Sequence, residues 1–88
     1  MAMMVGGDLG QLQRLEQQLT AESQTVGELQ ARLTSVLGNT TWTGPAADRF
    51  RNDWATTFSR ALQQLQHALA DNANVVRSRR AAIEQATS

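Results

Sequence analysis

The sequence contains no cysteine and no tyrosine, all eight of its basic residues are arginines, and it has one proline and one histidine. Without cysteine, no disulfide and no thiolate metal site can stabilise a small fold. No cluster of histidine and carboxylates marks a metal site, so no cofactor is expected. A chain of 88 residues argues for one domain that buries only about 60–65% of its unfolded surface. Association with another chain is the remaining common way to stabilise such a fold.

Excess charge is also absent, because eight basic residues balance eight acidic ones. Nucleic-acid and anionic-membrane binders usually carry an excess of positive charge, so neither partner is expected. The one basic run, which includes Arg77, Arg79 and Arg80, lacks interleaved aromatic residues and is interpreted as solvated.

Long apolar runs are missing as well. No segment reaches the roughly 18 apolar residues of a membrane span. The short apolar start, Met1 to Val5, lacks a basic region and a cleavage site, so we expect no conventional signal peptide. The protein either stays inside the cell or leaves by a route that needs no such peptide.

Alanine, glutamine, leucine and arginine dominate the chain, and these helix formers predict an all-α fold. We expect a flexible tail over residues 1–7, a first helix over 8–38, a turn over 39–44, a second helix over 45–84 and a tail over 85–88. Asp8 suits an N-cap, and Gly38 and Asn39 suit a C-cap. Pro45 suits the first turn of the second helix.

Each predicted helix carries a stripe of apolar residues at the spacing of a heptad repeat. Glu22 interrupts the first stripe, and Asn72 and Arg79 interrupt the second. Gly27, in the middle of the first helix, either allows a close helix approach or is simply tolerated. The stripe residues are Leu12, Leu15, Leu19, Val26, Leu29, Leu33 and Val36 in the first helix, and Phe50, Trp54, Phe58, Leu62, Leu65, Leu69, Val76 and Ile83 in the second.

A short turn makes two long helices antiparallel neighbours. The second stripe is wider than one neighbouring helix can cover, so a second hairpin is expected to complete a four-helix bundle. The partner interface then comprises the stripe residues from Leu12 to Leu33 and from Phe50 to Val76.

The sequence offers little chemistry. His67 and Asp71 are four residues apart, but no nucleophile or second metal ligand stands at a matching spacing, so an enzyme is not expected. The aromatic residues Trp42, Phe50 and Phe58 are expected to pack with Trp54 as a core near the turn.

Trp42-Thr43-Gly44, placed between two long amphipathic helices in a short all-helical chain without cysteine, resembles the WXG family. These proteins are small substrates of the type VII (ESX) secretion system, and the arginine-rich, lysine-free composition is similar to that of actinobacterial members. The resemblance implies a helical hairpin that pairs with a second WXG-type hairpin and is exported folded. Trp42 and Gly44 would be the motif residues.

In that family a Tyr-x-x-x-Asp/Glu motif after the second helix is the export signal, and the secretion ATPase reads it together with the partner's W-x-G. This chain has no tyrosine. It would therefore be the signal-less half of a heterodimer, or else a homodimer or a chain without its tail. The resemblance thus implies a secreted protein that is cytoplasmic before export.

The main alternative is a cytoplasmic adaptor or structural helical-bundle protein with no export. A membrane-active effector is a lesser alternative, since the zero net charge weakens binding to anionic lipid.

Overall fold

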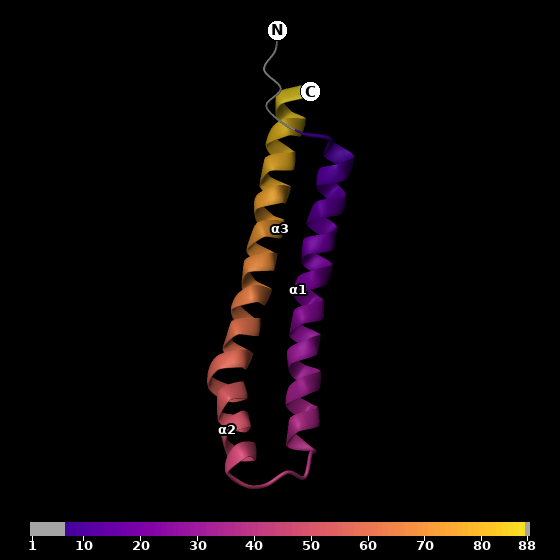
Figure 1. The fold of residues 1–88 in the computed structure, drawn as a ribbon. Helices are drawn as coiled ribbons and strands as arrows, with labels where there is room; N and C mark the ends of the chain where they lie inside the picture. Colours follow the sequence, from indigo (N-terminus) through magenta and orange to yellow (C-terminus); the bar gives the residue numbers. More distant parts are fainter. Residues whose placement is uncertain (1–6, 88) are drawn as a thin grey trace.

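The computed structural model describes residues 7–87, which form an antiparallel hairpin of two long helical columns (Figure 1). The first column is α1 (Leu9–Gly38). The second column is continuous and consists of α2 (Pro45–Asp53), the π-helical segment η1 (Trp54–Phe58) and α3 (Ser59–Thr87). The all-α class and the helical hairpin expected from the sequence are thereby confirmed.

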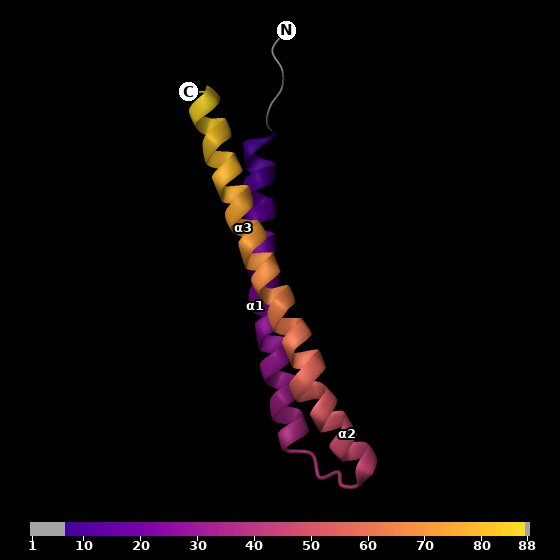
Figure 2. The ribbon, with the colours of Figure 1, turned by 90° about the vertical axis from the view of Figure 1, so that its left-hand side faces the viewer.

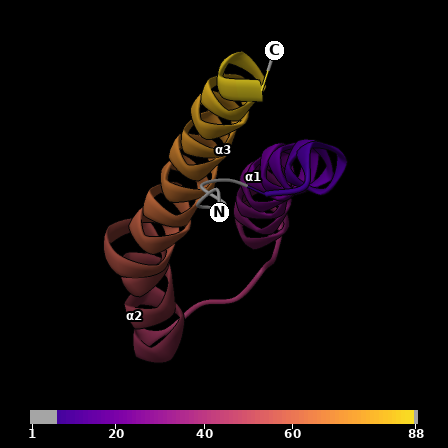
Figure 3. The same cartoon turned by 90° about the horizontal axis from the view of Figure 1, so that it is seen from above.

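The hairpin is long and thin, with extents of 68 × 17 × 14 Å. The two columns cross at a shallow angle and separate toward the turn, as Figure 2 shows from the side. The view along the hairpin shows α2 standing well away from the last turns of α1 (Figure 3). Because a hairpin is only one layer thick, each column contacts a neighbour along one side only.

Both ends of α1 follow the chemistry of the sequence. The Asp8 carboxylate caps α1 by accepting a hydrogen bond of 2.9 Å from the backbone N–H of Gln11. At the other end, the backbone N–H of Asn39 donates to the carbonyls of Ser35 and Val36. The helix therefore ends at Gly38 with Asn39 as its C-cap, but Asn39, with a φ of −96°, does not adopt the left-handed conformation.

The turn depends on Gly44. Its φ of 114° and ψ of 175° lie in a region that is essentially restricted to glycine. Arg51 closes the loop by donating from Nη1 to the Trp42 carbonyl at 2.7 Å and from Nη2 to the Thr40 carbonyl at 2.9 Å. One α2 side chain thus fixes the loop that carries the Trp-Thr-Gly triplet.

The second column runs further than the sequence predicts, because α3 continues to Thr87. Residues 85–87 are therefore helical, whereas a tail was expected from residue 85. Ala81, Ala82 and Ala86 are strong helix formers, and nothing in this stretch stops the helix. The expected N-terminal tail falls on residues 1–6, which lie outside the described part of the chain, and on Gly7.

The π-helical segment η1 is a feature that the heptad pattern did not predict. The backbone N–H of Ser59 donates to the carbonyl of Trp54, five residues earlier. One extra residue in a helical turn rotates everything beyond it relative to everything before it. The face that α2 turns toward α1 is thus offset by one residue from the face that α3 turns toward α1.

The buried core of the described chain is small and made of small residues. Ala47 is 0% exposed, Ala73 is 2% exposed and Ser23 is 7% exposed, and no large side chain is fully buried. A Cβ added at Gly27 would lie 2.7 Å from Nε2 of Gln66. The nearby atoms belong to the end of the flexible Gln66 side chain and not to the α3 backbone, so Gly27 gives no sign of a close approach of the two backbones.

Candidate partner-binding site

Polar side chains hold α1 and α3 together, and we call this set the inner contact. The Ser23 hydroxyl donates to the Gln66 carbonyl at 2.9 Å, and the Gln30 amide donates to the Ser59 hydroxyl. Nearer the open end, the Glu16 carboxylate joins α1 to α3. None of these residues belongs to the apolar stripes of the sequence.

Glu16 is the strongest electrostatic element of the inner contact. Its two carboxylate oxygens accept from Arg77 Nε and from Arg80 Nη2, each at 2.9 Å, and its side chain is 12% exposed. The hydrogen bond from Arg77 lowers the pKa of Glu16 below its ordinary value of 4.5. Partial burial opposes this shift, while the hydrogen bond and charge of Arg80 add to it. The expectation that this basic run is solvated is therefore wrong for Arg80, whose side chain is 24% exposed. Arg77 remains 58% exposed although it shares the same partner. That partner lies 61 and 64 residues away along the chain.

Large apolar side chains remain exposed beside the inner contact. Their exposed fractions range from 37% for Leu29 to 61% for Val36. We define the outer face as the exposed residues Leu15, Leu29, Leu33 and Val36 of α1 together with Phe50, Phe58 and Leu65 of the second column.

The outer face is a single surface because of its register. Leu15 and Leu29 each precede an inner-contact residue of α1, namely Glu16 and Gln30. Phe58 and Leu65 precede Ser59 and Gln66 in the same way. An antiparallel helix pair has an approximate twofold axis perpendicular to its plane, so equivalent positions on both helices fall on the same side.

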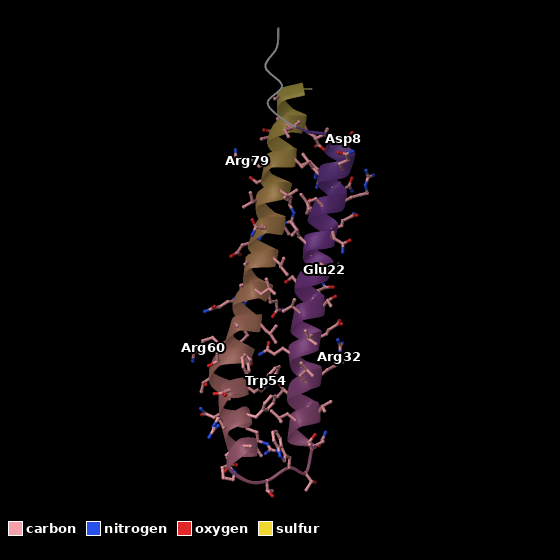
Figure 4. The ribbon with its side chains drawn as sticks, in the orientation of Figure 1. Asp8, Glu22, Arg32, Trp54, Arg60 and Arg79 are labelled. Atoms are coloured by element: carbon pink, nitrogen blue, oxygen red, sulfur yellow. The ribbon has the colours of Figure 1, made fainter. Side chains whose placement is uncertain are left out.

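The π-helical segment is what brings Phe50 onto this surface. Phe50 and Phe58 are eight residues apart, which in an uninterrupted α-helix rotates one about 80° from the other. The extra residue in η1 compensates for most of that rotation. Trp54 instead lies between the columns (Figure 4), where its indole N–H donates to the Thr34 hydroxyl at 3.0 Å.

The predicted interface residues therefore divide into two groups. The first group is half-buried along the hairpin itself: Leu12, Leu19, Val26, Trp54, Leu62, Leu69 and Val76. The second group is exposed on the outer face: Leu15, Leu29, Leu33, Phe50, Phe58 and Leu65. One hairpin thus uses about half of each stripe and leaves the other half uncovered.

The outer face contains a groove at its turn end. Its volume is about 210 Å³, and it is lined by Leu33, Val36, Leu37, Thr40, Phe50 and Trp54. The groove forms where α2 stands away from the last turns of α1 (Figure 3). It could receive one large apolar side chain of a partner.

The motif tryptophan lies beside this groove. Trp42 is 41% exposed, and its ring centroid is 5.9 Å from that of Phe50 with the planes tilted by 54°. The expected aromatic core near the turn is therefore wrong as a closed core. Two helices cannot enclose four large rings, so Trp42, Phe50 and Phe58 keep between 41% and 47% of their surface exposed.

The described residues contain no grouped metal ligands. Among residues 7–87 no three histidine, cysteine or carboxylate side chains are placed to hold a metal ion. His67 is exposed on α3. None of the described helices is both long enough and apolar enough to span a bilayer.

Comparison with family models, with curated proteins and with solved structures finds no match to this chain.

Proposed function

We propose that this protein acts by pairing its outer face with a second helical hairpin to form a four-helix bundle. An exposed apolar surface that runs along both columns is the observation that carries the proposal. Monomeric soluble proteins rarely leave a contiguous apolar surface of more than a few hundred Å² uncovered. Half of each heptad stripe remains available for a partner after the hairpin has formed.

We further propose that the pair is a type VII secretion substrate of the WXG type and that this chain is its signal-less half. The support is the position of the triplet. Gly44 makes the turn with a φ of 114°, and Trp42 stays exposed beside the aromatic end of the outer face. Trp42 could therefore contribute to a surface shared by the partner and the secretion ATPase, and the partner would supply the missing tyrosine motif.

An export assay tests this proposal. The chain, tagged and co-expressed with a candidate partner in a bacterium that has a type VII system, is measured in culture supernatant and in cells. Trp42→Phe is expected to reduce export at least about tenfold while leaving helix content unchanged. Thr43→Ala, in the same loop but outside the motif, is the matched control and should be exported like the wild type.

Gly44→Ala serves as a second variant. Because φ at Gly44 is 114°, alanine should strain the turn by about 1–3 kcal/mol, so its folding must be checked by circular dichroism. Two results would contradict the secretion proposal. One is retention of the wild-type chain in cells whose type VII system exports another substrate, and the other is full export of Trp42→Phe. The cytoplasmic adaptor, which needs only the outer face, would then be preferred.

A further inference from the structure

The outer face is not uniformly apolar. Its apolar residues concentrate toward the turn. Leu33 and Val36 lie near the end of α1, and Phe50 and Phe58 lie near the start of the second column. Toward the open end, the same heptad rows carry Glu22 on α1 and Asn72 and Arg79 on α3, all exposed. Figure 4 shows Glu22 near the middle of α1 and Arg79 on α3 near the chain ends.

The hydrogen bonds of these polar residues are local or missing. The Glu22 carboxylate accepts only from Gln18 on its own helix, at 3.2 Å. The Asn72 amide donates to the Ala68 carbonyl, one turn earlier, at 2.7 Å. Arg79 has no ion pair among the described residues, whereas Glu16 is already taken by Arg77 and Arg80. The hairpin itself therefore leaves the charges of Glu22 and Arg79 uncompensated.

A second copy could stack on the outer face in one of two alignments. With the turns at opposite ends, α1 lies over α1, so Glu22, within two residues of the middle of α1, meets its own copy. The middle of α1 is level with Gln66 through the Ser23 hydrogen bond, so in that alignment Arg79, 13 residues beyond Gln66, falls between Phe50 and Phe58 of the copy. Two carboxylates and two unpaired arginines would then face the interface.

With the turns at the same end, α1 lies over the second column of the copy. The Arg80–Glu16 ion pair sets the level of this stacking, so Arg79 falls opposite Leu15, the neighbour of Glu16. Glu22, the neighbour of Ser23, then lies at the level of Gln66, between Leu65 and Asn72 of the copy, and meets no cation. In both alignments Arg79 faces an apolar side chain, and burying an unpaired charge is costly.

Resting on the proposed pairing, we infer that the outer face rejects a second copy of this chain and fits a different helical hairpin. That partner carries a carboxylate at the level of Arg79 and a cationic side chain at the level of Glu22. Polar residues within an apolar helix interface select a partner because a wrong partner leaves them unsatisfied.

The size of the surface is sufficient for such a partner. The α1 column is about 45 Å long at 1.5 Å per residue, and the hairpin is 17 Å across in its wider short dimension. The covered area would be on the order of 700–800 Å², close to the roughly 800 Å² that each partner buries in a stable complex.

Sedimentation equilibrium of the purified full chain tests the inference without an identified partner. The wild type is expected to be monomeric at micromolar concentration. Glu22→Leu combined with Arg79→Leu should lower the dissociation constant for self-association at least about tenfold. Glu22→Gln with Arg79→Gln, which adds no apolar surface and is safer for folding, should shift it in the same direction by less.

The matched control combines Glu28→Leu with Arg60→Leu. It replaces the same residue types at exposed positions outside the outer face and should self-associate like the wild type. A tight wild-type dimer, a leucine variant no tighter than wild type, or a control that tightens equally would each overturn the inference. None of these results depends on export, so failure of the inference is distinguishable from failure of the secretion proposal.

Discussion

The contact between the columns is mixed, whereas the outer face is mainly apolar. Half-buried apolar side chains such as Leu19 and Leu69 lie between the columns beside polar groups. Where α1 and α3 meet, the hydrogen-bonding groups are Glu16, Ser23 and Gln30. On the outer face, leucine, valine and phenylalanine stand 37–61% exposed. The hydrophobic effect favours removal of that surface from water. The hairpin by itself leaves that surface uncovered, and its burial against a second hairpin is what the proposed function requires.

The same comparison explains why small residues dominate the buried positions. Ala47, Ala73 and Ser23 are the buried residues of the described chain. Because the hairpin is one layer thick, only small side chains between the columns are enclosed completely.

The largest expected effect on the isolated chain comes from placing too large a side chain at a buried position of α3. Ala73→Leu places a large side chain where 2% of the residue is exposed, and overpacking costs about 1–3 kcal/mol. Thermal unfolding followed by circular dichroism should show a clear decrease in Tm. Ala68→Leu, at an exposed position of the same helix, should leave Tm close to wild type. Equal effects of both substitutions would show that the columns are not closely packed at Ala73.

A smaller effect compares two leucines four residues apart. Leu69→Ala removes a half-buried side chain between the columns and should cost about 2 kcal/mol. Leu65→Ala removes a side chain that is 47% exposed and should cost less than about 1 kcal/mol in the dilute chain.

Chemical denaturation of both variants at low protein concentration measures the difference. If Leu65→Ala destabilises the dilute chain as much as Leu69→Ala, the outer face is already covered in the free protein. The comparison between the two surfaces would then be wrong.

The smallest expected effect concerns pH and the Glu16 ion pairs. Since the pKa of Glu16 is lowered in the folded chain, its carboxylate stabilises the fold above the unfolded-state pKa. That stabilisation is lost as the pH falls from 4.5 through the folded pKa. Glu16→Gln should therefore be less stable than wild type at neutral pH, and the difference should disappear in acid.

Glu22→Gln is the control for this measurement, because Glu22 has no cationic partner among the described residues. The difference in the free energy of unfolding between Glu22→Gln and wild type should change little across the same pH range. A difference between wild type and Glu16→Gln that persists unchanged in acid would exclude the ion pairs as its cause.

The heptad pattern predicted which residues are apolar and periodic but not which of them face the neighbouring column. The stripe of α1 is centred between two rows: the row of Leu12, Leu19 and Val26 is half-buried, and the row of Leu15 and Leu29 is exposed. A repeat of 3.5 residues does not distinguish a contact with a helix of the same chain from a contact with a helix of another chain, because both contacts require the same spacing of apolar residues. The ion pairs of Glu16 were not predicted for a different reason, because its arginine partners are distant in the sequence.

What the sequence alone determined is local. Helix-forming composition, the Asp8 cap, Pro45 and Gly44 specify two helices and a turn, because these effects act within a few residues. The π-helical offset at η1, the division of each stripe into an inner and an outer half, and the Glu16 ion pairs were decided only by tertiary structure. They depend on how two columns meet along their whole length, where distant residues such as Glu16 and Arg80 come within 2.9 Å of one another.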